Sequence, residues 1–206
     1  MQVRDKIVVV TGGANGIGRA LCEIFHGAGA AKVVVADIDS AAARGVAASI
    51  AGAAFKCDVG KEKDIIHVIE ETERLFGPIA LFCSNAGIGG GFDPLSENAG
   101  GDSDEPWSRS WAVHVMAHVY AARHLIPRMK ARGEGYFLNT ISAAGLLSQV
   151  GSPAYSRPSM RRSDLPRIWR SRTRRMASRF RSCVRRASTP TCCARFRKAR
   201  NPATAI

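Results

Sequence analysis

The stretch Lys6–Gly18, KIVVVTGGANGIG, decides how this chain of 206 residues folds. Its first half is a β-branched run, which predicts a buried strand over Lys6–Thr11. Its second half is a glycine-rich turn, and the apolar spacing after it predicts a helix over Gly16–Ala28. Glycines let the backbone approach a ligand closely, and the free N–H groups at a helix start attract anions. Because this turn joins a strand to a helix, it predicts a binding site for a diphosphate.

The alternation of strand and helix continues outward from this stretch as far as residue 156. The expected strands are Lys32–Asp37, Ala53–Val59, Ile79–Ser84 and Tyr136–Ile141, and the expected helices are Ser40–Ile50, Lys61–Phe76 and Trp107–Arg132. Parallel strands need crossover helices, and such crossovers are almost always right-handed. The sequence therefore predicts an α/β fold with one domain over residues 1–156. That domain is a Rossmann-type doubly wound parallel sheet with helices on both faces.

An acidic residue, Asp37, closes the second expected strand. In Rossmann-type domains a carboxylate at this place binds the hydroxyls of the adenosine ribose. A carboxylate repels a 2′-phosphate, and the next residue is Ile38 rather than an arginine or lysine. The pair therefore favours NAD over NADP as cofactor. The alternative is that Asp37 is a solvated helix cap, a role that Asp39 fills equally well.

Four motifs give the chain a resemblance to a known family. They are Thr11-Gly12-x-x-x-Gly16-x-Gly18, Asp58-Val59, Asn85-Ala86-Gly87, and Ser142 placed thirteen residues before Tyr155. In this order and spacing, residues 4–156 resemble the classical short-chain dehydrogenase/reductase family. The resemblance implies a dinucleotide site made of Thr11, Gly12, Asn15, Gly16, Ile17, Gly18, Asp37, Ile38, Asp58, Val59, Asn85, Ala86 and Gly87.

The same resemblance implies a chemistry. In the family a tyrosine exchanges a proton with the substrate oxygen, a serine polarises that oxygen, and hydride passes to or from the nicotinamide; Tyr155 and Ser142 match these two residues. Free tyrosine has a pKa of about 10, so only about one molecule in a thousand is ionised at neutral pH without a nearby cation. The family places a lysine four residues after the tyrosine, but Ser159 stands there in this chain. His114 stands where the family has an asparagine that supports a water relay, and a histidine can still hydrogen-bond there.

These matches imply an NAD(P)-dependent oxidoreductase of secondary alcohols and ketones that assembles as a homodimer or homotetramer. The missing lysine implies that the activity of the chain as written is impaired. One alternative is a cofactor-binding remnant without turnover. No metal is expected, because His114 and His118, one helical turn apart, have no third ligand.

The net charge of +13 is confined to the end of the chain. Residues 1–156 hold 14 Lys and Arg against 16 Asp and Glu, whereas residues 157–206 hold 16 Lys and Arg against Asp164 alone. Beyond residue 156 the apolar residues no longer recur with the spacing of a helix or a strand, so we expect residues 157–206 to be an Arg-rich, disordered tail. A basic arm that binds nucleic acid is a further alternative, although the tail has few aromatic residues and no recognised motif.

A shifted reading frame accounts for this tail. When the tail is back-translated and read one base over, Pro158–Arg167 can read TKHAAVGFAE, which restores the family lysine at position 159. In the same frame Phe180–Ser188 can read VSVLCPQGV, which resembles the sixth strand of the family. We hypothesise that residues after about 156 are a frameshifted translation of a GC-rich gene. The C-terminal strands are then missing or scrambled, and the expected strand Tyr136–Ile141 loses its outer neighbour.

The remaining features point to a cytoplasmic protein. The six cysteines show no metal-type spacing and are expected to be free thiols in a reducing compartment. No stretch approaches the roughly 20 apolar residues that cross a bilayer. The apolar run at the N-terminus is followed by glycines rather than a cleavage site, so we interpret it as a strand and not as a signal peptide.

Overall fold

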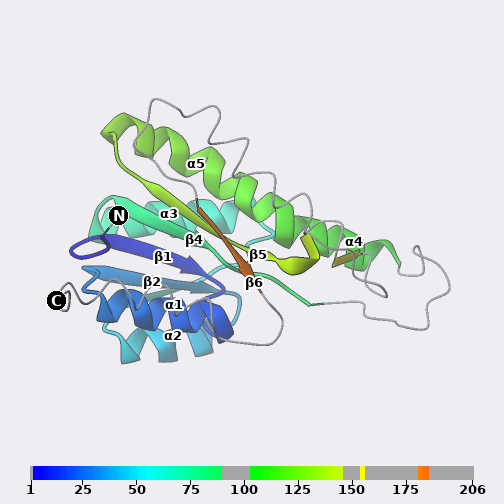
Figure 1. The fold of residues 1–206 in the computed structure, drawn as a ribbon, viewed down its shortest axis with the longest axis horizontal. Coiled ribbons are helices and arrows are strands. Elements are labelled where there is room, and N and C mark those ends of the chain that lie inside the picture. The colour runs from blue at the N-terminus through cyan, green and yellow to red at the C-terminus, as the bar shows by residue number, and fades with distance from the viewer. Residues whose placement is uncertain (1, 90–102, 146–153, 156–180, 186–206) are drawn as a thin grey trace, which may run out of the picture.

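The structure is a computed structural model that describes residues 2–89, 103–145, 154, 155 and 181–185 (Figure 1). Strands and helices alternate along the chain in the order β1 (Ile7–Thr11), α1 (Gly16–Gly27), β2 (Lys32–Asp37), α2 (Ser40–Ser49), β3 (Ala53–Lys56), α3 (Glu62–Phe76), β4 (Ile79–Ser84), α4 (Asp104–Trp111), η1 (Ala112–Met116), α5 (Ala117–Arg132), β5 (Tyr136–Ser142), η2 (Ala143–Gly145) and β6 (Arg181–Arg185). The predicted Rossmann-type architecture is confirmed.

The strands form one parallel sheet in the order β3-β2-β1-β4-β5-β6. Strands β1 and β4 lie at its centre and are buried along their whole length, which is why both are continuous apolar runs in the sequence. The chain builds outward from β1 in one direction through β2 and β3, then returns to the other side of β1 with β4. The carboxyl ends of β1 and β4 therefore mark the switch point, where sheets of this kind bind their ligands.

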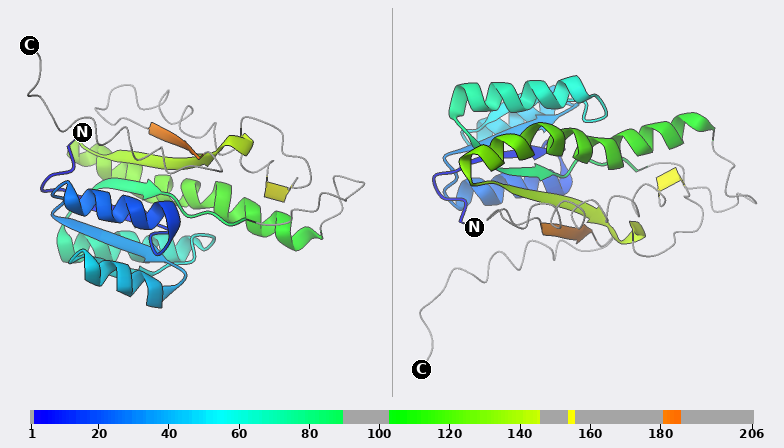
Figure 2. Two further views of the ribbon diagram at one scale, coloured as in Figure 1. Left: turned by 60° about the horizontal axis from the view of Figure 1, so that its bottom comes forward. Right: turned by 90° about the horizontal axis from the view of Figure 1, so that it is seen from above.

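The two faces of the sheet carry separate apolar cores. On one face, α1 and α2 pack through Leu21, Phe25 and Val46 against β-strand residues such as Val8 and Val35. On the other face, α3 and α5 pack through residues such as Ile65, Ile69, Leu125 and Met129 against Val9 and Phe82. Figure 2 shows α3 and α5 side by side along this second face. The alternation of side chains along each strand thus fills both cores and fixes the sheet between them.

The expected helix over Trp107–Arg132 is longer and less regular than predicted. It begins at Asp104 and is interrupted by η1, a π-helical turn over Ala112–Met116. It ends at Gly133, whose φ of 75° lies in the left-handed region that glycine adopts freely. A π turn widens the helix locally and is frequent at functional sites. This turn brings His114 toward the carboxyl edge of the sheet.

The expectation that the strand at Tyr136–Ile141 loses its outer neighbour is wrong. Strand β6 pairs with β5 in parallel, from Leu138 opposite Arg181 to Ser142 opposite Arg185. Sheet pairing uses main-chain N–H and C=O groups, so a segment without an apolar period can still form a ladder. Among the described residues β6 is one of the two edge strands of the sheet, and β3 is the other.

Other expectations fall partly outside the described residues. Apart from β6, the predicted disordered tail over residues 157–206 lies there. In the described part of the chain, no helix is long and apolar enough to cross a membrane. Cys22, Cys57 and Cys83 are free and buried, as expected. Burial is the largest influence on each of these thiols and raises the pKa of Cys22 and of Cys57 to about 12.

A carboxylate binds α3 to α5. Glu73 on α3 accepts hydrogen bonds from Arg128 at 2.9 Å, from Arg132 at 3.0 Å and from the backbone N–H of Ile79 at 3.3 Å. Burial is the largest single influence on the pKa of Glu73 and raises it, but the hydrogen bonds and the charge of Arg132 together outweigh burial. The pKa of Glu73 is therefore lowered from its ordinary value.

The substitution Glu73→Gln is expected to lower the free energy of unfolding at pH 7 by about 1–2 kcal/mol, because two arginines lose a partly solvated charged partner. Since the folded-state pKa is lowered, this stabilisation is present above the ordinary glutamate pKa of about 4.3. It is lost as the pH falls below that value. Urea unfolding at pH 7 and pH 3 measures both effects. The control is Glu70→Gln, whose exposed carboxylate meets Arg128 only at 3.5 Å; equal stability of the two variants at pH 7 would contradict the prediction.

Candidate active site

The glycine turn is folded so tightly that side chains are excluded from it. Gly12 has a φ of 64°, and a Cβ added there would lie 2.7 Å from the Cα of Ala86. A Cβ at Gly18 would overlap the carbonyl oxygen of Gly12. Asn15 precedes α1 without a side-chain capping bond, so the first N–H groups of α1 stay available to a ligand. The turn therefore presents bare backbone donors at the start of a helix.

Thr11 and Asn85 fasten this turn to the centre of the sheet. The hydroxyl of Thr11 donates to the carbonyl of Cys83 at 3.3 Å and accepts from the backbone N–H of Asn85 at 3.0 Å and of Ala86 at 3.2 Å. The side-chain amide of Asn85 donates to the carbonyl of Thr11 at 3.2 Å. Its oxygen accepts from Thr140 at 2.8 Å. The ends of β1, β4 and β5 are thereby held together around the turn.

Asp37 and Asp39 have separate roles. Asp39 caps α2 by accepting from the backbone N–H groups of Ala41 and Ala42. Asp37 instead accepts from Ala14 of the glycine turn at 3.0 Å and from Asp39 at 3.0 Å. The alternative that Asp37 caps the helix is therefore wrong, because Asp39 does so. Asp37 is half-buried at the edge of the turn.

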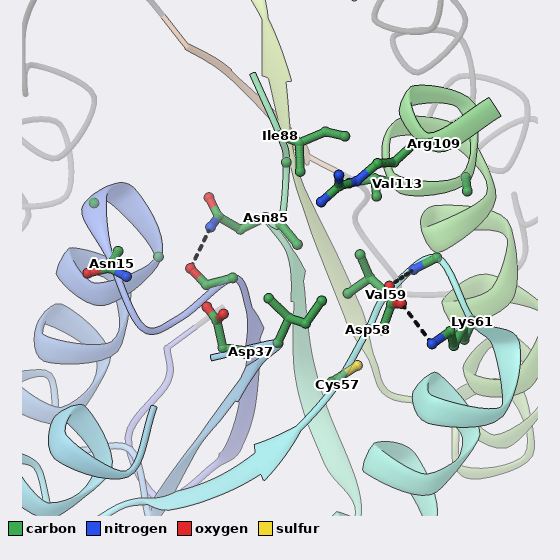
Figure 3. A pocket seen from close by; sticks show the side chains of 18 of the residues that line it. Asn15, Asp37, Cys57, Asp58, Val59, Lys61, Asn85, Ile88, Arg109 and Val113 are labelled. Atoms are coloured by element: carbon green, nitrogen blue, oxygen red, sulfur yellow. Dashed lines mark hydrogen bonds and ion pairs between the residues drawn. The ribbon is translucent and has the colours of Figure 1, made fainter. Parts of the chain in front are cut away.

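Asp58 closes the site on the side opposite Asn15. Its carboxylate accepts from the backbone N–H of Gly60 at 3.1 Å and pairs with Lys61 at 3.3 Å. Its own N–H donates to Asp64 at 2.9 Å. These bonds fix the loop between β3 and α3, from which Val59 projects into the site (Figure 3).

A cleft of about 650 Å³ lies between these elements, at the carboxyl ends of the central strands. Of the residues expected to bind the dinucleotide, the cleft is lined by Gly12, Asn15, Gly16, Ile17, Gly18, Asp37, Ile38, Asp58, Val59, Asn85, Ala86 and Gly87. Thr11 does not line it, because its hydroxyl is turned toward β4. The cleft is large enough for much of a dinucleotide and combines bare backbone donors with a carboxylate. These residues fit NAD(P), because only glycines at positions 12 and 18 avoid a collision with the backbone, and the turn can then hold its N–H donors around a diphosphate.

Tyr155 lies beside a second cavity of about 320 Å³. Ile88, Glu105 and Arg109 line both this cavity and the cleft, so the two spaces adjoin. Ser142 ends β5 and accepts from the backbone N–H of Ala144 at 3.2 Å, but it lines neither space. The structure thus brings Tyr155, but not Ser142, to the wall of a cavity next to the cleft. Position 159 lies outside the described residues.

His114 is buried on η1 and joins the cleft to Tyr155. Its Nε2 accepts from the backbone N–H of Ile88 at 3.1 Å, and its Nδ1 lies 3.0 Å from the hydroxyl of Ser110. Its ring meets that of Tyr155 edge to face, with centroids 5.2 Å apart. Because a backbone N–H can only donate, Nε2 must be unprotonated, and the proton of the neutral ring sits on Nδ1 and faces Ser110. A neutral His114 therefore cannot supply the cation that the absent lysine would have supplied.

Residues 6–157 match the family model described as short chain dehydrogenase. The chain belongs to the short chain dehydrogenase family. It is 36% identical over 157 residues to the 2,5-dichloro-2,5-cyclohexadiene-1,4-diol dehydrogenase of Sphingobium indicum, covering 75% of this chain and 60% of that protein. It is 33% identical over 159 residues to tropinone reductase-like 1 of Erythroxylum coca, covering 75% of this chain and 57% of that protein. This short chain dehydrogenase therefore spans less than two thirds of the length of these curated relatives.

Solved structures give the same family and fold. A short chain dehydrogenase/reductase of Burkholderia phymatum, in complex with NAD, superimposes with a TM-score of 0.81 at 25% identity, covering 96% of this chain and 79% of that chain. A 3-ketoacyl-(acyl-carrier-protein) reductase of Brucella melitensis, complexed with NADH, also gives 0.81, at 27% identity, covering 88% and 76%. The Rossmann-type assignment therefore holds for this short chain dehydrogenase.

Several residues of the cleft were not predicted from the sequence. Besides Ile88, Glu105 and Arg109, they are Cys57, Gly60, Lys61, Ala112 and Val113. The predicted Asp58-Val59 pair is flanked by Cys57, Gly60 and Lys61. Their position next to this pair in the sequence could have identified them as residues of the cleft. Arg109 and Val113 come from α4 and η1 and carry no motif of their own. Their helical spacing of four residues places both on one face of the helix, toward the cleft.

The substitution His114→Phe is expected to lower the free energy of unfolding by about 1–3 kcal/mol and to weaken NADH binding. It keeps an aromatic ring but leaves the N–H of Ile88 without its acceptor and the buried hydroxyl of Ser110 without its donor. Urea unfolding and NADH fluorescence measure the two effects. His114→Asn is the matched variant, because its amide oxygen can accept from Ile88. A His114→Phe protein as stable as the parent would contradict this role.

Proposed function

We propose that this chain binds NAD(H) in the cleft and exchanges a hydride between the nicotinamide and a secondary alcohol or ketone held beside Tyr155. The observation that carries the proposal is the cleft itself, in which a glycine turn with open backbone donors meets the carboxylate of Asp37. Backbone donors at the start of α1 suit the diphosphate, and Asp37 suits the hydroxyls of the adenosine ribose. The relatives crystallised with NAD and with NADH support the same cofactor class.

The residues beside the cleft suit proton exchange with the substrate. The nicotinamide supplies or accepts the hydride when it is bound. Tyr155 lies on the wall of the adjoining cavity, where its phenol can exchange a proton with a substrate oxygen. Ser142 accepts a hydrogen bond from the backbone N–H of Ala144, which leaves its own O–H hydrogen able to donate to that oxygen. His114 holds Ile88 and the ring of Tyr155 in place.

The second candidate function is a cofactor-binding module without turnover. Ser159 favours it, because the chain then lacks the cation that keeps a tyrosine ionised near neutral pH. For the chain as written we expect binding with slow turnover. Titration of NADH by fluorescence, followed by a panel of secondary alcohols with NAD and of ketones with NADH, separates the two functions. No NADH binding at millimolar concentration would overturn both.

Asp37 is expected to set the cofactor preference. The substitution Asp37→Asn should reduce the preference for NADH over NADPH at least about tenfold, because the negative charge that repels the 2′-phosphate is removed. Fluorescence titrations with the two cofactors measure the ratio. Asp39→Asn is the control, because it changes an equal charge two residues away that caps α2. An equal shift in both variants would show a general charge effect and contradict the assignment.

The family resemblance also leads us to propose a homodimer or homotetramer in the cytoplasm, where buried free thiols such as Cys22 stay reduced. Light scattering of the purified chain tests the assembly. A specific nucleic-acid partner is not part of the proposal, because the basic residues that would bind it lie in the segment we attribute to a shifted frame.

A further inference from the structure

We propose that Arg109 binds a carboxylate of the substrate, so that the substrate class is an alcohol or ketone that carries an acid group. The proposal rests on the proposed function, because it names the substrate of the same site. It makes Arg109 a specificity-determining residue on α4.

The first argument is the place of Arg109. It lines both the cofactor cleft and the cavity beside Tyr155, so its side chain stands where the two spaces adjoin. Figure 3 shows it pointing from the helix toward Ile88 and the cleft. A cation at this junction is within the space that a substrate must occupy if it is to reach both Tyr155 and the nicotinamide.

The second argument is the lack of a partner. Five of the eight arginines whose side chains the structure describes form ion pairs, for example Arg74 with Glu71 and Arg123 with Glu62. The side chain of Arg109 forms no ion pair or hydrogen bond with any described residue, although Glu105 lies one helical turn before it. Lys61, the other cation that lines the cleft, is paired with Asp58 at 3.3 Å. The guanidinium of Arg109 is therefore the cation there that remains open to a ligand.

The third argument is the distance from the glycine turn. Figure 3 shows Asn15 and Arg109 on opposite sides of the cleft, with Asn85 between them. The diphosphate belongs at the turn, next to the start of α1. Arg109 therefore faces the substrate side rather than the cofactor phosphates.

The chemistry of the second cavity completes the argument. Besides Arg109, Glu105 and Ser110, its described wall is small or apolar at Ile88, Gly89, Pro106 and Ala154, with Tyr155 as the proton-exchanging group. A guanidinium presents paired N–H donors that match the two oxygens of a carboxylate. A short oxo acid meets all three features: its acid binds Arg109, its ketone faces Tyr155, and its carbon chain lies on the apolar wall.

The test measures binding of matched acids and esters to the whole chain. The probes are 2-oxopentanoate, 4-oxopentanoate and 5-oxohexanoate, each beside its methyl ester, titrated into protein saturated with NADH and into protein without cofactor. At least one acid is expected to bind tenfold or more tightly than its ester. The substitution Arg109→Gln should remove that preference, whereas Arg44→Gln, at an exposed arginine on α2, should keep it.

Each outcome decides the matter. Equal binding of acids and esters, or a preference that survives Arg109→Gln, would overturn the proposal. So would a loss of NADH affinity in Arg109→Gln with the acid preference intact, because the cation would then serve the cofactor. A cationic ketone probe, (4-oxopentyl)trimethylammonium, that binds more tightly than the acids and whose binding is lost in Glu105→Gln would assign the site to Glu105 instead. The titrations without cofactor do not depend on NADH binding. If NADH fails to bind, the proposed function is wrong, but these titrations still test whether Arg109 binds the acid.

Discussion

The substitution Gly18→Ala is expected to weaken NADH binding at least about a hundredfold, which corresponds to about 2.7 kcal/mol. The added methyl group would overlap the carbonyl oxygen of Gly12, which is backbone and cannot move aside as a flexible side chain would. The turn must then open, and the backbone donors at the start of α1 lose their position around the diphosphate. Fluorescence titration with NADH measures the loss, and circular dichroism with urea unfolding measures what remains of the fold.

A glycine elsewhere in the chain gives the matched control. Gly45 lies in the middle of α2, and a Cβ there would meet nothing within 4 Å. Gly45→Ala is expected to leave NADH affinity unchanged and to stabilise the protein by up to about 1 kcal/mol, because alanine favours a helix. If Gly18→Ala bound NADH as tightly as Gly45→Ala, the glycine turn would not be the diphosphate site.

The central strands and the turn were predictable because their environment leaves few alternatives. Residues of β1 and β4 are buried on both faces of the sheet, so each strand appears in the sequence as an unbroken apolar run. A glycine turn directly after such a run indicates a connection from a buried strand to a helix. Asp37 was predicted from its place at the end of β2, whereas Asn85, which follows β4, was predicted from the family resemblance; both line the cleft.

The missed features lack a local signal. The π turn at Ala112–Met116 lies within a continuous helical period, so nothing in the spacing marks it. Strand β6 has no apolar alternation in its sequence, so its pairing with β5 could not be predicted from that sequence. Arg109 reaches the cleft only because α4 lies beside it in the folded chain, which is a tertiary relation that no short motif encodes.

The substitution Ser159→Lys is expected to raise the turnover number at pH 7 by about 10²–10³. Only about one free tyrosine in a thousand is ionised at neutral pH. A cation that makes the phenolate the main form therefore raises the phenolate population by about three orders of magnitude. His114 cannot supply this charge, because its Nε2 accepts the N–H of Ile88. Position 159 lies outside the described residues, and the expectation rests on its spacing of four residues from Tyr155.

The pH dependence of this gain separates an electrostatic effect from a structural one. The gain should be largest near neutral pH and should shrink as the pH approaches 10, where a tyrosine ionises without help. Ser159→Gln, which is long and polar but uncharged, should give no gain, and Tyr155→Phe added to Ser159→Lys should abolish it. A lysine that changes nothing at any pH, in a chain that still binds NADH, would mean that residues after 156 do not return to Tyr155. Turnover would then require the whole segment after residue 156 to be restored in the shifted frame, rather than one residue. If that restored chain also stayed inactive, the frameshift would be ruled out as the cause of the low activity.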